Sequence, residues 1–259
     1  WEFQSYLRNG RWDTAGSWQK KRVAPNARHN SHKLSLALLK PRTGQYDQAR
    51  VLIDELIAEN PASAVAQAAL TDWYIRQGRQ EEALAVCNDF LKHYENMDAY
   101  RLRARVLIAL GERDRALEDI QELVQRAGQS AAAWLSISEL YGLVGQTEQA
   151  LDAARKALSF EPDSFEAQKR LAMLLLNNLQ TQQEGMDLLA KALEQQPGDV
   201  QLRLRKAAAL LDQGGGSTAQ AVRILNALVE QFPRLEEAWA MLTEWYLRSN
   251  QPGMAMDTL

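Results

Sequence analysis

Residues 131–162, AAAWLSISELYGLVGQTEQALDAARKALSFEP, contain the clearest structural pattern in the chain. A stripe at helical spacing runs through the first half of this stretch, made of Trp134, Ile137, Ser138 and Tyr141. Gly145 follows where that helix must end, because glycine accepts the left-handed conformation of a C-terminal cap. A second helix is expected from about Thr147, with alanines on one face that let two helices approach closely. Pro162 ends the unit, so the stretch predicts two helices joined by a tight turn.

The same spacing recurs along the whole chain. A small residue marks each unit, at Ala15, Ala49, Ala83, Ala116, Ala150, Gly185, Ala221 and Ala255, and successive differences lie between 33 and 36. Five positions earlier stand Gly10, Gly44, Gly78, Gly111, Gly145, Gln180, Gly216 and Asn250. A single compact domain needs no such rule. An array of stacked two-helix units does.

Composition and the chain ends limit the class of protein. The residues are 46% hydrophobic, and the single cysteine, Cys87, excludes an internal disulfide. No apolar stretch approaches the roughly 20 residues that cross a bilayer. The chain starts at Trp1 inside a repeat and stops at Leu259 part-way through a helix. We therefore expect a piece of a longer soluble protein, cytoplasmic or periplasmic, whose cut ends expose apolar groups and could associate with another chain.

The pattern of residues 131–162 resembles the tetratricopeptide repeat family, and the last unit repeats it with Trp239, Leu242, Thr243, Tyr246, Asn250 and Ala255. The resemblance covers essentially the whole chain. It implies an all-α fold, a right-handed superhelix of antiparallel helix pairs without a sheet. The expected organisation is one array, with partial units at 1–27 and 236–259 and full units at 30–61, 64–95, 97–128, 131–162, 165–197 and 200–233. Unit 97–128 departs from the pattern with Arg103 in place of leucine, so Leu102 and Val106 are expected to take over packing.

Nothing in the sequence favours catalysis, and we expect no enzyme, no cofactor and no metal. The run Gly214–Ser217 lacks the lysine and the preceding strand of a phosphate-binding loop. His29 and His32 have no cysteine or nearby carboxylate to complete a metal site. Cys87 has no base partner and is interpreted as a small buried hydrophobic residue.

The family resemblance implies a protein-binding groove lined by the first helix of each unit. The groove positions carry Asp72, Arg76, Arg101, Arg105, Glu139, Lys169, Asn177, Arg205 and Asp212. Arg101 and Arg105 are four residues apart on one helix, so both can grip a carboxylate or phosphate. Equally, they can pair with Asp72 or Glu139 on neighbouring helices. The function expected is a non-catalytic scaffold that binds a peptide or partner protein; the alternative is a recruiting arm of a larger glycosyltransferase or polysaccharide-export machine.

The uneven charge suggests a second binding surface. Residues 1–42 carry nine Lys/Arg and two acids, a net charge of +7, whereas the whole chain has a net charge of −3. Lys20, Lys21, Arg22 and Arg28 belong to this basic patch, which contains Trp12 and Trp18. Basic groups beside aromatic rings suit single-stranded nucleic acid. The negative overall charge and the resemblance both favour a protein partner instead, so nucleic acid is the less favoured hypothesis.

Overall fold

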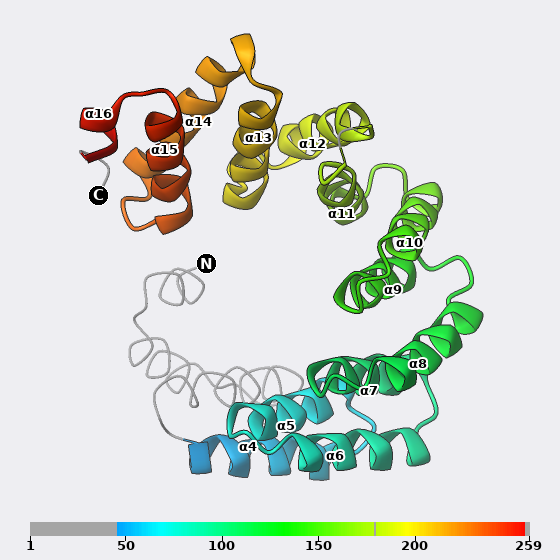
Figure 1. Ribbon diagram of the computed structural model, residues 1–259. Coiled ribbons are helices and arrows are strands. Elements are labelled where there is room, and N and C mark those ends of the chain that lie inside the picture. The colour runs from blue at the N-terminus through cyan, green and yellow to red at the C-terminus, as the bar shows by residue number, and fades with distance from the viewer. Residues whose placement is uncertain (1–45, 179, 257–259) are drawn as a thin grey trace. The chain divides into compact units, whose positions relative to one another are not determined.

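The computed structural model describes residues 46–178 and 180–256, and all regular structure in those ranges is helical, with no strand. The all-α architecture predicted from the sequence is therefore confirmed. The chain divides into two compact units, residues 1–126 and 127–259, and Figure 1 shows the helices of both.

The described part of the first unit is built from two-helix hairpins in chain order. Its helices are α4 (Tyr46–Glu59), α5 (Ala64–Arg76), α6 (Gln80–His93), α7 (Met97–Ala109) and α8 (Arg113–Arg126). Each helix packs on the next, and α5 also contacts α7. The first helices of consecutive hairpins thus lie beside one another. Three-residue turns separate α5 from α6 and α7 from α8.

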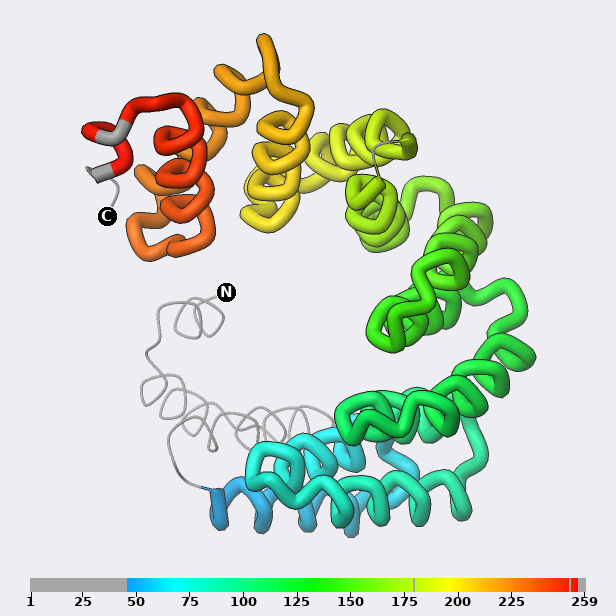
Figure 2. Tube along the Cα trace, viewed as in Figure 1, coloured from blue at the N-terminus to red at the C-terminus, as the bar shows by residue number. Residues whose placement is uncertain are grey.

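The second unit continues the same plan, as the trace in Figure 2 shows. Its helices are α9 (Ala131–Leu143), α10 (Thr147–Phe160), α11 (Phe165–Leu175), α12 (Gln182–Gln195), α13 (Val200–Gln213), the 3-10 turn η2 (Gly215–Ser217), α14 (Thr218–Gln231), α15 (Glu236–Arg248) and α16 (Pro252–Met256). Again the first helices touch, α9 against α11 and α13 against α15.

The small residues that mark the period lie where two helices meet. Ala83, Ala116, Ala150 and Ala221 are fully buried. At Gly185 the approach is closer still: a Cβ there would lie 3.1 Å from the Leu175 Cβ and 3.1 Å from the Leu176 backbone nitrogen. A methyl group at this one position would be tighter against α11 than most Cβ contacts, and its neighbours would have to shift to admit it.

Side-chain caps and turn residues fix where the helices begin and end. Ser63, Asn96, Ser130, Ser164 and Asp199 each accept a hydrogen bond from the backbone N–H three residues on, at the start of α5, α7, α9, α11 and α13. Gly78, Gly111 and Gly145 have φ of 72°, 79° and 80° at the ends of the first helices. The sequence predicts the turn of unit 200–233 at Gly214–Ser217, with the break near Gly216. The turn begins directly after Gln213, the last residue of α13, and its positive φ values are at Gly214 and Gly215.

Candidate functional site

The first helices of the first unit present paired charges to solvent. On α5, the Arg76 Nε lies 2.6 Å from the Asp72 Oδ2, and about half of each side chain is exposed. This contact raises the pKa of Arg76, first through the hydrogen bond and then through the charge of Asp72. Both side chains belong to α5, so this ion pair does not connect α5 to another helix.

Arg101 and Arg105 share the same side of α7. The Arg101 Nη2 lies 2.6 Å from the Asp98 Oδ1, three residues earlier on the same helix. Arg105 is exposed and has no partner among residues 46–178 and 180–256. The expected alternative pairing is therefore wrong for Arg101, whose acceptor is Asp98, and for Asp72, whose donor is Arg76. Local i,i+3 and i,i+4 pairs form because they need no contact with another helix.

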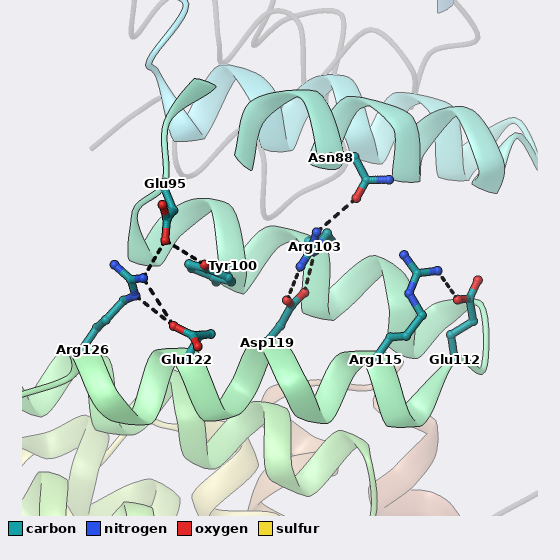
Figure 3. Close-up of polar contacts among 9 residues, drawn as sticks. All are labelled: Asn88, Glu95, Tyr100, Arg103, Glu112, Arg115, Asp119, Glu122 and Arg126. Carbon is teal, nitrogen blue, oxygen red and sulfur yellow. Dashed lines mark hydrogen bonds and ion pairs between the residues drawn. The ribbon is translucent and has the colours of Figure 1, made fainter. Parts of the chain in front are cut away.

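An ion pair with a buried carboxylate joins α7 to α8 (Figure 3). The Asp119 carboxylate is 1% exposed and accepts from Arg103 twice, 2.6 Å from Nη2 and 2.9 Å from Nε. Arg103 also donates to the Asn88 Oδ1 at 3.3 Å. The hydrogen bonds to Asp119 raise the pKa of Arg103 against the effect of burial. Sequence reasoning noticed Arg103 but missed Asp119, although Asp119 follows buried Ala116 by one helical turn.

A second polar cluster in Figure 3 lies at the C-terminal end of α8. Arg126 donates to Glu95 at 2.7 Å and to Glu122 at 3.3 Å, and the Tyr100 hydroxyl donates to the same Glu95 oxygen at 3.1 Å. This cluster ties α8 to the segment before α7, so it orients the helix that carries Arg101 and Arg105.

In the second unit the predicted groove residues have different surroundings. Glu139 on α9 is exposed. Lys169 on α11 donates to the Asp199 Oδ2 at 2.7 Å, and its ammonium also lies 5.5 Å from the centre of the Phe165 ring. Burial alone would raise the pKa of Asp199, but the bonds from Lys169 and from the Leu202 backbone lower it. Lys169 therefore holds α11 against the start of α13.

Asn177, Arg205 and Asp212 line one pocket between the end of α11, the start of α12 and one side of α13. Its volume is about 460 Å³, and Leu176, Gln182, Ala208 and Ala209 complete the lining. Sequence reasoning placed the first three residues on the groove but missed Gln182. That residue begins a second helix, which the repeat pattern assigns to packing. The six-residue turn 176–181, longer than its neighbours, was the available signal.

The basic patch with Lys20, Lys21, Arg22 and Arg28 lies outside the described residues. Within residues 46–178 and 180–256, no group of three or more His, Cys, Asp or Glu side chains could hold a metal ion. None of the helices in those ranges is both long and apolar enough to cross a membrane.

Comparisons with known proteins agree on one fold. A thermophilic TPR protein of Thermus thermophilus is 27% identical, with a TM-score of 0.52 over 70% of this chain and 99% of that one. A tetratricopeptide repeat protein from Parabacteroides merdae aligns over 98% and 96% with 15% identity and a TM-score of 0.58. PilW, a type IV pilus biogenesis factor, aligns over 84% and 100% with 19% identity and a TM-score of 0.61. At the last two identities the likeness concerns the fold alone.

A curated relative is much longer than this chain. Anaphase-promoting complex subunit 7 of Dictyostelium discoideum is 27% identical over 224 residues, which are 84% of this chain and 37% of that protein. The chain therefore spans little more than a third of its relative. The tetratricopeptide repeat model matches residues 17–231. With the recurring period and the stacked helical hairpins, this match shows that the chain belongs to the tetratricopeptide repeat family.

Proposed function

We propose that this chain is a non-catalytic protein-interaction scaffold that binds a segment of a partner protein on the exposed faces of its first helices. The observation that carries this proposal is the pairing of the first-helix charges in the first unit. The pairs Asp72–Arg76 and Asp98–Arg101 are each formed within one helix and remain exposed. Packing does not require them, so a partner can replace either contact. Exposed pairs of this kind contribute only about 0–1 kcal/mol to stability.

Arg105 is the most available of these groups. It is exposed, lies one turn from Arg101, and has no partner among the described residues. Two guanidinium groups on one face favour a partner segment that carries carboxylates, because guanidinium binds carboxylate through paired hydrogen bonds. We therefore expect an acidic segment to bind α7.

The longer relative supports an assembly role. Its name describes a subunit of a multiprotein complex, and a scaffold of stacked repeats suits such a role because it offers a long surface. An arm that recruits substrate to a larger enzyme or export machine would use the same surface. That alternative remains a hypothesis about domains outside this chain.

A charge-reversal experiment tests the proposal. Peptides that bind the chain are first selected from an unbiased displayed library, and their affinities are then measured for Arg101→Glu/Arg105→Glu. The variant should lose about 2 kcal/mol or more of binding free energy, roughly 30-fold in Kd. Its melting temperature should be unchanged, because neither side chain packs in the core.

Arg113→Glu/Arg115→Glu is the matched control. It makes the same change of charge on α8, a second helix, where Arg113 and Arg115 are exposed. The control should bind the selected peptides like the wild type. Equal losses of affinity in both variants would show that the net charge of the chain, and not the position of the arginines, causes the loss. Unchanged affinity in the α7 variant would refute α7 as the binding surface.

A further inference from the structure

The pocket between α11, α12 and α13 contains a buried polar group with no partner. Gln182 is only 7% exposed, and its side-chain amide has no hydrogen bond within residues 46–178 and 180–256. Leaving a buried amide unpaired costs free energy that an apolar residue of the same size would avoid. Gln182 lines a polar pocket of about 460 Å³. A ligand bound in this pocket can supply the hydrogen-bond partner that the protein does not.

Two opposite charges lie along one side of the same pocket. Arg205 and Asp212 both line it from α13, both are exposed, and neither forms an ion pair or hydrogen bond with a described residue. Seven residues are close to two helical turns, so both project from one face about 10 Å apart. That separation excludes a direct contact between them.

These groups together select a class of ligand. Asp212 disfavours a simple anion, and Arg205 disfavours a simple cation. A ligand with both charges satisfies both residues. The amides of Asn177 and Gln182 each offer donors and an acceptor, as a peptide group does. An extended peptide advances about 3.3 Å per residue, so acidic and basic side chains two residues apart reach both ends of the pocket.

We propose that this pocket binds a dipolar peptide segment of a partner protein. Arg205 takes a carboxylate, Asp212 takes an ammonium or guanidinium group, and Asn177 and Gln182 bond the peptide group between them. The proposal rests on the proposed function, because it assigns a partner chemistry to the first-helix faces. It adds a site in the second unit and a contribution from a second helix, through Gln182.

Capped synthetic peptides test the selectivity directly. The probe is acetyl-Ala-Glu-Ala-Lys-Ala-amide, and the controls have Glu or Lys at both charged positions. Each is titrated into the full chain, with Kd taken from NMR shifts, including those of the Asn177 and Gln182 side-chain amides. The dipolar peptide should bind at least about tenfold more tightly than either control, since each control brings one like charge against the pocket.

Charge variants then assign the two ends. Arg205→Gln should weaken the dipolar peptide about tenfold or more. Asp212→Lys should reverse the preference, so that the peptide with two glutamates becomes the best ligand. The matched controls are Arg223→Gln on α14 and Glu194→Lys on α12, both exposed positions outside the pocket. They should bind all three peptides like the wild type.

A substitution of Gln182 distinguishes a role in ligand binding from a role in stabilising the free protein. Gln182→Met keeps the length of the side chain and removes the unpaired amide. The variant should melt about 2–4 °C higher and yet bind the dipolar peptide several-fold less tightly. A lower melting temperature would show that the amide stabilises the free protein, and would overturn its assignment to a ligand.

The remaining outcomes separate this proposal from the proposed function. Equal affinity for all three peptides, or wild-type binding by both charge variants, would overturn the pocket assignment even if the α7 variant behaves as expected. Equally tight binding of ε-aminocaproate, a small dipolar molecule, would overturn a peptide ligand. If the pocket variants lose the dipolar peptide and the α7 variant still binds the selected peptides like the wild type, the pocket is supported and the binding role of α7 is refuted.

Discussion

Arg103 and Asp119 place two charges inside the α7–α8 hairpin, where the repeat pattern has an apolar contact. The sequence predicted that Leu102 and Val106 would replace the missing leucine. Val106 is indeed buried, and Leu102 packs against it. The replacement is incomplete without Asp119, because the partly buried guanidinium of Arg103 and the buried carboxylate of Asp119 compensate each other's charge. Pattern matching shows that Arg103 is unusual, but only the structure shows which side chain of the next helix reaches it.

Removing one partner of the Arg103–Asp119 pair should therefore destabilise the protein more than removing both. Asp119→Ala should lower the free energy of unfolding by about 2 kcal/mol, since it leaves the partly buried Arg103 without its carboxylate. Arg103→Leu/Asp119→Leu should recover most of that loss. Urea unfolding of both variants provides the measurement. A double variant as unstable as Asp119→Ala would contradict a role limited to pairing.

Cys87 makes stability depend on alkaline pH. Burial raises the pKa of the thiol from 9.0 to about 11, against the opposing contact with the Thr71 hydroxyl. A raised folded-state pKa means that the stabilisation is complete below the unfolded value and is lost as pH rises toward the folded value. The free energy of unfolding should fall by on the order of 2 kcal/mol between pH 9.0 and about 11.

The matched variant for this pH prediction is Cys87→Ala. Its free energy of unfolding should fall less over the same pH range, and the difference between the two curves removes the contribution of the tyrosines. Parallel curves for the wild type and the variant would show that the thiol does not titrate as inferred.

At the scale of the helices, the repeat period alone predicted most of the local structure. Thr147 begins α10, and Gly145 has the expected positive φ. The residues with positive φ after α13 were harder to predict, because any of three successive glycines can adopt the left-handed conformation and only packing selects among them. The pocket was harder still, since its Gln182 lies on a helix that the pattern assigns to the interior.

Gly214 and Gly216 lie in the same turn but differ in backbone conformation, so alanine should have different effects at the two positions. Gly214 has φ 68° and ψ −161°, a conformation that is essentially restricted to glycine, whereas Gly216 has no positive φ. Neither has an atom within 4 Å of an added Cβ. Gly214→Ala should therefore cost about 1–3 kcal/mol through backbone strain, and Gly216→Ala should be neutral or slightly stabilising. Thermal unfolding of the pair would show the opposite order if the cap lay at Gly216.

At the scale of the whole molecule, two surfaces compete for the role of binding site. One is formed by the first helices, and the other is the basic patch of residues 1–42 with its net charge of +7. Sequence patterning defined both, but it could not rank them, because ranking depends on which charges are already paired. The structure supplies that information for residues 46–178 and 180–256.

Salt dependence distinguishes the two surfaces. Lys20→Glu/Lys21→Glu/Arg22→Glu should leave the affinity of the selected peptides within about threefold of the wild type at physiological salt, where exposed charges are screened beyond about 8 Å. Binding through the basic patch would instead be lost in this variant and would weaken steeply from low to high salt in the wild type.

Hydrogen–deuterium exchange of the chain with a selected peptide tests the central claim most directly. We expect new protection in first helices, with α7 foremost, and little change in the second helices α6, α8, α10 and α14. Exchange reports the footprint without any substitution, so it does not depend on how a variant folds. Protection confined to the second helices, or to residues 1–42, would contradict the claim that the first-helix faces bind the partner.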